Sequence, residues 1–281
     1  MSHKSLLFVP GNTPSMLKNC DLHDADLVIF DLEDAVFEDQ KDAARHLVST
    51  TMNDAPFLPS NIAVRINQAG SGTFEADLAS LPLDKINSLV IPKAEPETID
   101  AVVRALTRLG DDTTALIALI ETPRGLAEAG RVASHPRVSG LLLGAEDLTA
   151  SLFATRTKSS EEILLARSMV VLSARTYDKD AYDTPWTDTD DLEGLGKDAR
   201  FARQLGFDGK AAIHPGHIRA INRAFMPSED EILWAERVMT KARNQRGAFA
   251  LDGKMVDEPV MRRARRIIGM ASSGKSGGTD D

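Results

Sequence analysis

The chain has 281 residues, of which 42% are hydrophobic and 27% charged, and its formal net charge is −9. This length allows one large hydrophobic core, such as an α/β barrel of roughly 250 residues, or two smaller cores. The acidic balance argues against nucleic acid or a membrane as a partner, because binding either one needs a basic face.

The N-terminal region contains no predicted targeting segment. Its apolar run from Leu6 to Val9 is too short for the core of a signal peptide, and no stretch reaches the about 18 apolar residues of a membrane span. The single cysteine, Cys20, cannot form an internal disulfide, which fits a reducing compartment. We therefore expect a cytoplasmic protein, with an import signal removed before residue 1 as the open alternative.

Short apolar runs recur along the chain at intervals of roughly 25 to 35 residues, separated by Ala-, Leu- and Arg-rich stretches of helical character. Buried parallel strands have continuous apolar sequences, and strands that alternate with helices pair in parallel. The predicted strands are residues 5–9, 27–31, 62–66, 88–91, 114–120, 140–143, a weaker one near 181–186, and 209–213. Eight such units predict an α/β fold of the closed (β/α)8 TIM-barrel type over residues 1–226.

The alternative fold is an open, doubly wound sheet. It would be expected to carry a glycine-rich phosphate turn after its first strand. Residues 9–14, Val-Pro-Gly-Asn-Thr-Pro, contain one glycine and two prolines and do not match that pattern. The barrel is therefore favoured.

Beyond the eighth strand the sequence predicts a C-terminal helical extension and arm. In order, its elements are a helix over 217–225, a helix opened by the capping box Ser228-Glu229-Asp230-Glu231 and running to about Arg246, an extended segment over 248–257, and a last helix starting near Pro259. Because a complete barrel precedes it, segment 227–271 is expected to pack on a neighbouring subunit. Residues 272–281 are expected to form a disordered tail.

Ionisable residues follow five consecutive predicted strands, although the strand interiors are nearly free of them. These strand ends are Asp31 to Asp34, Arg65 to Asn67, Lys93 to Glu95, Glu121, and Glu146 with Asp147. In a barrel, the chemistry is carried at the carboxyl ends of the strands. The pattern therefore indicates the lining of one active site.

Glu121 and Asp147 are the candidate metal ligands. Two carboxylates can hold Mg²⁺ when water and substrate oxygens fill the remaining octahedral positions. The structural alternative is that Glu121 pairs with Arg124 or Arg65, while Asp147 caps a helix that starts at Leu148.

Arg65 could bind a carboxylate in bidentate fashion or stabilise an enolate oxygen as negative charge develops on it. Its alternative role is an ion pair with the acids of the second strand. Those acids, Asp31, Glu33 and Asp34, either contact the metal through water, with Lys93 beside them, or form salt bridges to Lys93, Arg65 or Arg45.

Four other features have weaker signals. Lys93 could be mistaken for a Schiff-base lysine, but nearby acids should raise its pKa, which favours an ion-pair role. Asp257 either starts the last helix or acts as a general acid or base. His214 is expected to be a structural histidine. The aspartate-rich loop over 183–191, which contains Trp186, is expected to be a solvated, capped loop rather than a metal site.

Several motifs in combination resemble the citrate lyase beta-subunit-like family of the HpcH/HpaI aldolase/citrate lyase superfamily. They are Ser5 to Gly11, Asp31 to Val36, Lys41 to Arg45, Val64 to Asn67, Ile91 to Lys93, Ile120 to Pro123, Gly144 to Leu148, Gly206 to Lys210 and Ile213 to Pro215. The resemblance covers nearly the whole chain. It implies a homotrimer or hexamer of barrels that handles acyl-coenzyme A thioesters with Mg²⁺, or with Mn²⁺ in its place.

The resemblance also assigns roles to residues. Glu121 and Asp147 would bind the metal, and Arg65, Phe8 and Glu121 itself would contact substrate. The segment Asp252 to Pro259 is similar to the arm of the malyl- and citramalyl-coenzyme A lyase branch, in which an aspartate at the position of Asp257 is catalytic and comes from the adjacent subunit.

Two positions in the N-terminal region match the family less well. Lysines that hold the coenzyme A phosphates in relatives are matched only loosely, by Lys18. Lys4 stands where relatives often have Arg, which puts bidentate recognition at that position in doubt.

The expected activity is reversible Claisen cleavage of a 3-hydroxyacyl-coenzyme A thioester, such as malyl- or citramalyl-coenzyme A, into a 2-oxoacid and an acyl-coenzyme A. Arg65 would face the enolate oxygen and Asp257 would move the proton. One alternative is a malyl-coenzyme A thioesterase or a malate-synthase-like enzyme, in which water reaches the thioester. Another is the beta subunit of a citrate lyase complex that acts on a citryl thioester.

Overall fold

The computed structural model describes residues 3–54, 58–243, 245 and 247–275. The chain forms two compact units, residues 1–222 and 223–281. Their boundary falls within helix α10 (Ile218–Phe225), close to the predicted end of the barrel at residue 226.

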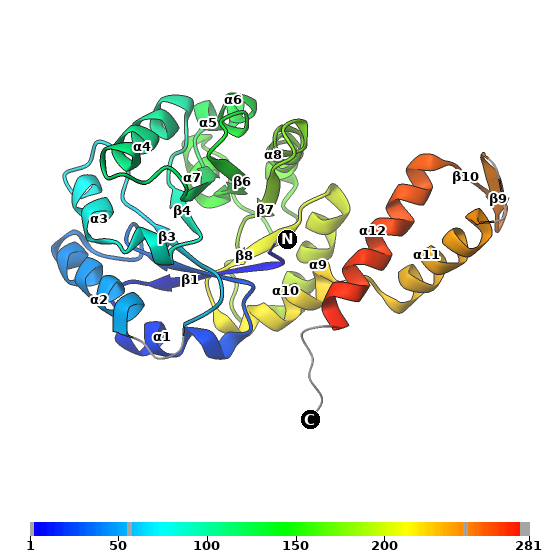
Figure 1. The fold of residues 1–281 in the computed structure, drawn as a ribbon, viewed down its shortest axis with the longest axis horizontal. Helices are drawn as coiled ribbons and strands as arrows, with labels where there is room; N and C mark the ends of the chain where they lie inside the picture. Colours follow the sequence, from blue (N-terminus) through cyan, green and yellow to red (C-terminus); the bar gives the residue numbers. More distant parts are fainter. Residues whose placement is uncertain (1–2, 55–57, 244, 246, 276–281) are drawn as a thin grey trace. The chain divides into compact units, whose positions relative to one another are not determined.

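The first unit is a closed barrel of eight parallel strands in sequence order, with β8 paired back to β1 (Figure 1). Its strands are β1 Ser5–Pro10, β2 Leu27–Asp31, β3 Ile62–Arg65, β4 Ser88–Ile91, β5 Ala115–Ile120, β6 Val138–Leu143, β7 Asp180–Asp183 and β8 Gly209–Ala212. The predicted TIM barrel is confirmed. The weak seventh strand ends earlier than predicted, and Pro185, which has no N–H to donate to a sheet, lies just beyond it.

Helices connect the strands. They are α1 Pro14–Lys18, α2 Lys41–Asp54, α3 Phe74–Ser80, α4 Pro96–Arg108, α5 Pro123–Ala127, α6 Ala129–Ala133, α7 Ala145–Ser151, α8 Leu164–Thr176 and α9 Leu192–Leu205. Local sequence explains several of their ends. Helix α4 starts at a proline, whose fixed φ suits the first turn, and α9 stops at Gly206, whose φ of 105° is left-handed.

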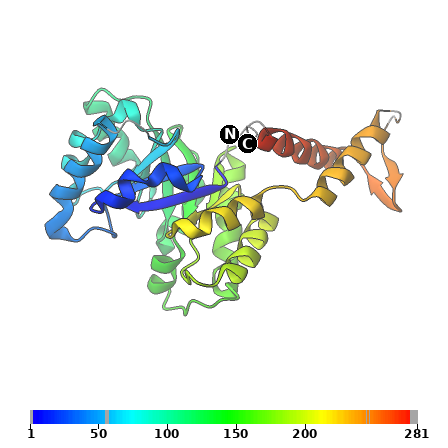
Figure 2. The ribbon, with the colours of Figure 1, turned by 90° about the horizontal axis from the view of Figure 1, so that it is seen from below.

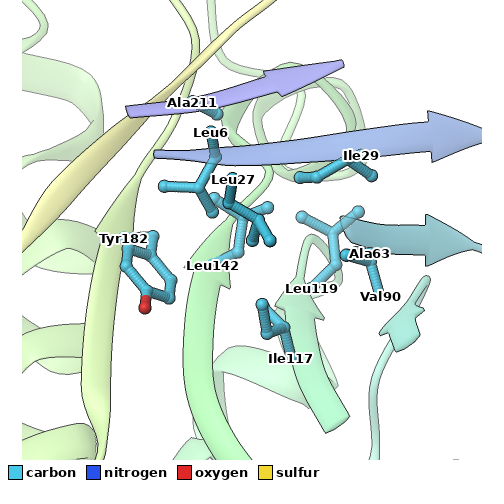
Figure 3. Packing of buried hydrophobic residues seen from close by; sticks show 10 residues of the cluster. All are labelled: Leu6, Leu27, Ile29, Ala63, Val90, Ile117, Leu119, Leu142, Tyr182 and Ala211. Carbon is cyan, nitrogen blue, oxygen red and sulfur yellow. The ribbon is translucent and has the colours of Figure 1, made fainter. Parts of the chain in front are cut away.

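Apolar side chains fill the barrel interior. Ten of them, contributed by all eight strands, form one cluster (Figure 3): Leu6, Leu27, Ile29, Ala63, Val90, Ile117, Leu119, Leu142, Tyr182 and Ala211. Phe8 packs against this cluster from β1. Because the interior is packed rather than hollow, chemistry is confined to the ends of the barrel.

The second unit is a pair of helices joined by a hairpin. Its elements are α11 Glu229–Ala242, β9 Phe249–Leu251, β10 Lys254–Val256 and α12 Glu258–Lys275. Figure 2 shows the hairpin as a short two-stranded ribbon at one end of the helix pair. The second unit has a hydrophobic core of its own, formed by Ala235, Val238, Phe249, Val256, Ala264 and Ile267. The predicted capping box is confirmed, since Ser228 Oγ accepts from the Glu231 N–H and the Glu231 carboxylate accepts from the Ser228 N–H.

Three details of this unit differ from the prediction. Helix α11 ends at Ala242 rather than near Arg246. The extended segment is a hairpin whose turn residues, Asp252 and Gly253, have φ of 51° and 74°, as the common two-residue hairpin turn requires. Helix α12 runs to Lys275, so residues 272–275 are helical instead of disordered; the Ser272 hydroxyl donates to the Ile268 carbonyl one turn earlier. The rest of the predicted tail, 276–281, lies outside the described residues.

Within the described parts of the chain, none of the helices combines the length and the apolar character that crossing a bilayer requires.

Candidate active site

A cavity of about 260 Å³ lies where the strands of the barrel end. Four of the predicted site residues line it together: Phe8 from β1, Arg65 from β3, Glu121 just after β5, and Asp147 from the first turn of α7. Asp31, the last residue of β2, and Asp34 in the loop after it also line the cavity. Residues far apart in the sequence therefore share one site, as the strand-end pattern predicts.

Arg65 is held by the acids at the end of β2 and in the loop after it. Its Nε and Nη2 donate to the two carboxylate oxygens of Asp31 at 2.7 and 2.5 Å. Its Nη1 lies 2.9 Å from Glu33 Oε2 and 3.5 Å from Asp34 Oδ2. The ring of Phe8 packs against the guanidinium, and the ring centroid lies 5.1 Å from Arg65 Cζ. The ion pair given above as an alternative is thus present, although Arg65 also lines the cavity.

The charge of Arg65 is permanent and its position is fixed. Burial by itself would lower the pKa of Arg65, but the hydrogen bonds and negative charge of Asp31, with Glu33 and Asp34, raise the pKa above its usual value. Asp31 is itself held by the N–H groups of Glu33 and Ala35. Such a bidentate arrangement leaves the guanidinium little freedom to turn.

Lys93 connects the fourth and fifth strand ends. It has a left-handed φ of 46°, uncommon for a residue with a side chain, and its backbone N–H donates to Glu121 Oε1 at 2.7 Å. Its Nζ lies 3.6 Å from Glu33 Oε1. Burial lowers the pKa of Lys93, but Glu33 and Glu121 outweigh it and leave the pKa raised, which is the opposite of what a Schiff-base lysine needs.

Glu121 is the buried acid of the site, with 3% of its surface exposed. Burial, followed by the negative charges of Glu33 and Asp147, raises its pKa to about 8, even though the Lys93 N–H favours the charged form. Gly144 lies directly against it. A Cβ at position 144 would lie 2.7 Å from Glu121 Cβ and 2.8 Å from Oε2, so only glycine allows β6 to end this close to the carboxylate.

The structural alternatives for the two candidate ligands are wrong. Helix α7 begins at Ala145 with Gly144 as its N-cap, so Asp147 is inside the first turn and does not cap a helix starting at Leu148. Arg124 pairs with Glu95, Glu97 and Glu128 rather than with Glu121. Arg65 likewise forms its ion pairs with Asp31, Glu33 and Asp34.

The acids of this cavity fit a hard divalent cation. Glu121 and Asp147 both offer carboxylate oxygens to the cavity, and a cation would offset the burial and the negative charge of Asp147 that raise the pKa of Glu121. No group of three or more His, Cys, Asp or Glu side chains arranged to hold a metal occurs among the described residues. Mg²⁺ does not need one, because it often binds through one or two carboxylates and retains several water molecules.

The remaining predicted residues lie elsewhere. Lys18 ends helix α1, is exposed, and is not part of the cavity lining. Asp257 belongs to the second unit, where its Oδ1 accepts from the Val260 N–H at 3.3 Å at the start of α12. His214 accepts from the Gly216 N–H through Nδ1. In the aspartate-rich loop, Asp191 caps α9 and pairs with Lys158.

Sequence reasoning missed two features next to the cavity. One is a buried ionic cluster in which Lys210 and Arg167 both pair with Asp183 and Asp198. The only feature of the sequence that indicated this cluster was a lysine, Lys210, inside the eighth strand. The other is Thr184, which lines the cavity and whose hydroxyl accepts a hydrogen bond from Ala145. A threonine after a strand carries no such signal.

Comparison with known proteins identifies the family of this chain. The model of the HpcH/HpaI aldolase/citrate lyase family matches residues 4–215. The citrate lyase subunit beta of Leuconostoc mesenteroides subsp. cremoris is 32% identical over 96% of this chain and 93% of its own length. The mitochondrial citramalyl-CoA lyase of Rattus norvegicus is 31% identical over 96% of this chain and 86% of its own.

A solved structure is similar in its fold as well. The crystal structure of CitE from Mycobacterium tuberculosis, in complex with magnesium, acetoacetate and coenzyme A, superimposes with a TM-score of 0.83 at 34% identity. The match covers 96% of this chain and 98% of that one.

Proposed function

Because this chain belongs to the HpcH/HpaI aldolase/citrate lyase family and is a lyase, we propose that it reversibly cleaves a 3-hydroxyacyl-coenzyme A thioester such as malyl- or citramalyl-coenzyme A. The products would be a 2-oxoacid and an acyl-coenzyme A. The observation that carries the proposal is the single cavity that brings Glu121, Asp147 and Arg65 together. The similarity to a citramalyl-CoA lyase and to a CitE that binds magnesium, acetoacetate and coenzyme A supports it.

Glu121 and Asp147 would hold Mg²⁺, with Mn²⁺ as a substitute. When bound there, the ion supplies a Lewis acid that polarises an oxygen of the substrate. The protein contributes the rigidity of the site. The Lys93 N–H fixes one oxygen of Glu121, and the absence of a side chain at Gly144 leaves room for the carboxylate.

Arg65 would stabilise the negative oxygen that forms on the thioester as the carbon–carbon bond breaks. Its guanidinium is charged at every working pH and is fixed by Asp31, so it need not reorganise during the reaction. Asp31, Glu33 and Asp34 surround Arg65, so its single positive charge is fully compensated before substrate binds. This should keep the anionic substrate and product from binding so tightly that release becomes slow.

Asp257 would move the proton to or from the acyl carbon. We propose that residues 227–271 form an arm that brings Asp257 to the cavity of a neighbouring copy, in a homotrimer or hexamer. Lys18 would assist in holding the coenzyme A phosphates. A cytoplasmic location is part of the same proposal, supported by the buried, free thiol of Cys20.

A second candidate is the beta subunit of a citrate lyase complex acting on a citryl thioester. Its support is the 32% identity to such a subunit over 93% of that subunit's length. The two candidates use the same cavity and differ in whether the chain acts alone on a soluble thioester.

Product analysis tests the proposal. Purified protein with Mg²⁺ and malyl- or citramalyl-coenzyme A should yield glyoxylate or pyruvate together with acetyl-coenzyme A. The Glu121→Gln variant should lose activity on the order of 100-fold or more, because Lewis-acid stabilisation is worth several kcal/mol. Glu97→Gln, at an exposed residue that pairs with Arg124, is the matched control and should be unchanged.

Other products would point away from a lyase that acts alone. Free thiol together with the intact hydroxyacid would indicate a thioesterase instead. Turnover only when the thioester is carried on an acyl carrier protein would identify the citrate lyase subunit.

A further inference from the structure

Thr184 is the first residue after β7 and is 1% exposed. It lines the same cavity as Glu121, Asp147 and Arg65. Its hydroxyl oxygen lies 3.1 Å from the backbone nitrogen of Ala145, which opens helix α7 two residues before Asp147. Thr184 thus links the seventh strand to the segment that carries a candidate metal ligand.

The Thr184 hydroxyl has an unused hydrogen-bond donor. A threonine hydroxyl carries one proton and two lone pairs, and here one lone pair accepts from the Ala145 N–H. Among the residues that the structure describes, no acceptor lies in hydrogen-bonding geometry with its proton. A buried polar group normally finds a partner. A ligand bound in the cavity could supply this missing hydrogen-bond acceptor.

Buried charges fix Thr184 in place. Lys210 Nζ donates to the Thr184 carbonyl oxygen at 2.6 Å, and also to Asp183 and Asp198 at 2.6 Å each. Lys210 and Asp183 are fully buried. The backbone of Thr184 is therefore held by Lys210 of β8, and its side chain by the Ala145 N–H of α7. A donor held this rigidly loses little entropy when it binds a ligand.

The surroundings decide what kind of ligand fits. The cavity is lined mainly by apolar side chains and carboxylates, which cannot donate hydrogen bonds when ionised. The guanidinium of Arg65 has only part of its N–H groups free for the thioester oxygen, because Nε, Nη1 and Nη2 are each directed at Asp31 or Glu33. A free hydroxyl proton in such a cavity suits an oxygen that only accepts, such as that of a carboxylate or a ketone.

We propose that Thr184 is a substrate-binding residue whose hydroxyl donates a hydrogen bond to an oxygen of the 2-oxoacid part of the substrate. This inference rests on the proposed function for the identity of the ligand. It adds a residue that the seventh strand contributes to the site, besides those at the ends of the first, second, third, fifth and sixth strands.

Titration calorimetry with Mn²⁺-loaded protein tests the proposal, with oxalate, pyruvate and glyoxylate as the probes. Thr184→Val keeps the shape of the side chain but removes the donor, and should weaken binding of the probes about tenfold or more, or about 1.4 kcal/mol. Thr184→Ser keeps the hydroxyl and should bind within about threefold of the unaltered protein. Thr149→Val is the matched control. It removes a buried hydroxyl of α7 that bonds the Ala145 carbonyl but is not part of the cavity lining, so it should not change probe affinity.

Mn²⁺ affinity, measured by electron paramagnetic resonance without a probe, separates binding from positioning. We expect Thr184→Val to retain it within about threefold. Equal probe binding by Thr184→Val and the unaltered protein would overturn the inference. So would a loss of Mn²⁺ affinity as large as the loss of probe affinity, because Thr184 would then act only through Ala145.

The same experiment keeps the two proposals apart. Unaltered protein that binds no probe at all overturns the role of Thr184. Unaltered protein that binds oxalate in a Thr184-dependent way, but cleaves no thioester, supports this inference while refuting the proposed lyase activity.

Discussion

Lys210 should be among the most costly single residues to replace in the barrel. Its ammonium group is fully buried and makes three hydrogen bonds of 2.6 Å, to Asp183, Asp198 and the Thr184 carbonyl oxygen. Arg167 bonds the same two carboxylates, so two cations and two anions compensate each other. In Lys210→Met, the two acids share one cation and a net negative charge stays buried.

The expected cost follows from this geometry. Breaking a buried ion pair by removing one partner typically destabilises a protein by about 3–5 kcal/mol, because the remaining charge is left without compensation. Asp198 illustrates the balance: burial raises its pKa, whereas Lys210 and Arg167 lower it and leave the pKa below its usual value. The control is Lys197→Met, at an exposed lysine that pairs with Glu193 one helical turn away. This variant should lower the free energy of unfolding by at most about 0.5 kcal/mol.

Urea unfolding followed by tryptophan fluorescence measures both variants. The chain has two tryptophans, and in a Trp234→Phe background the buried Trp186 of the barrel is the only reporter. The double variant Lys210→Met, Asp198→Asn restores the charge balance and should recover at least about 1 kcal/mol. If Lys210→Met and Lys197→Met lowered the free energy of unfolding by equal amounts, the buried cluster would not contribute as argued here.

Two further predictions concern the proposed activity. Asp257→Asn should reduce turnover about 100-fold or more, as loss of a general acid or base does, while Mn²⁺ affinity measured by electron paramagnetic resonance stays unchanged; full turnover would leave Asp257 with its hydrogen bond to Val260 as its only role. Gly144→Ala should weaken Mn²⁺ binding about tenfold or more, because the new methyl group would lie 2.7 Å from Glu121 Cβ and must displace the carboxylate. Gly130→Ala, where nothing lies within 4 Å of the added carbon, is its control, and equal affinities in the two variants would contradict the steric argument.

Much of the fold can be predicted from local sequence. Continuous apolar runs such as Leu27–Asp31 identify buried parallel strands, and the observed strand has the predicted ends. The capping box at Ser228 identifies the start of α11 because its hydrogen bonds join residues three apart. The end of α11 was predicted less well, and the turn at Asp252 and Gly253 was missed although Asp-Gly is a common hairpin signal.

The acids and the arginine of the site were also visible in the sequence, because a barrel brings all its strand ends to one face. Glu121 and Arg65 could be chosen from their positions after apolar runs, without knowing any contact. The sequence could not tell that Asp31 and Glu33 both hold Arg65, or that Asp147 lies inside the first turn of its helix.

The sequence by itself therefore determined which strands and helices form and which residues stand at their ends, because these depend on neighbours a few residues apart. Only the tertiary structure decided which side chains meet: Thr184 with Ala145, Lys210 with Asp198, and Gly144 with Glu121. The physical reason is that such contacts depend on distances of a few Å between segments from different strands and helices. Closing the barrel fixes those distances, whereas no local preference of the chain encodes them.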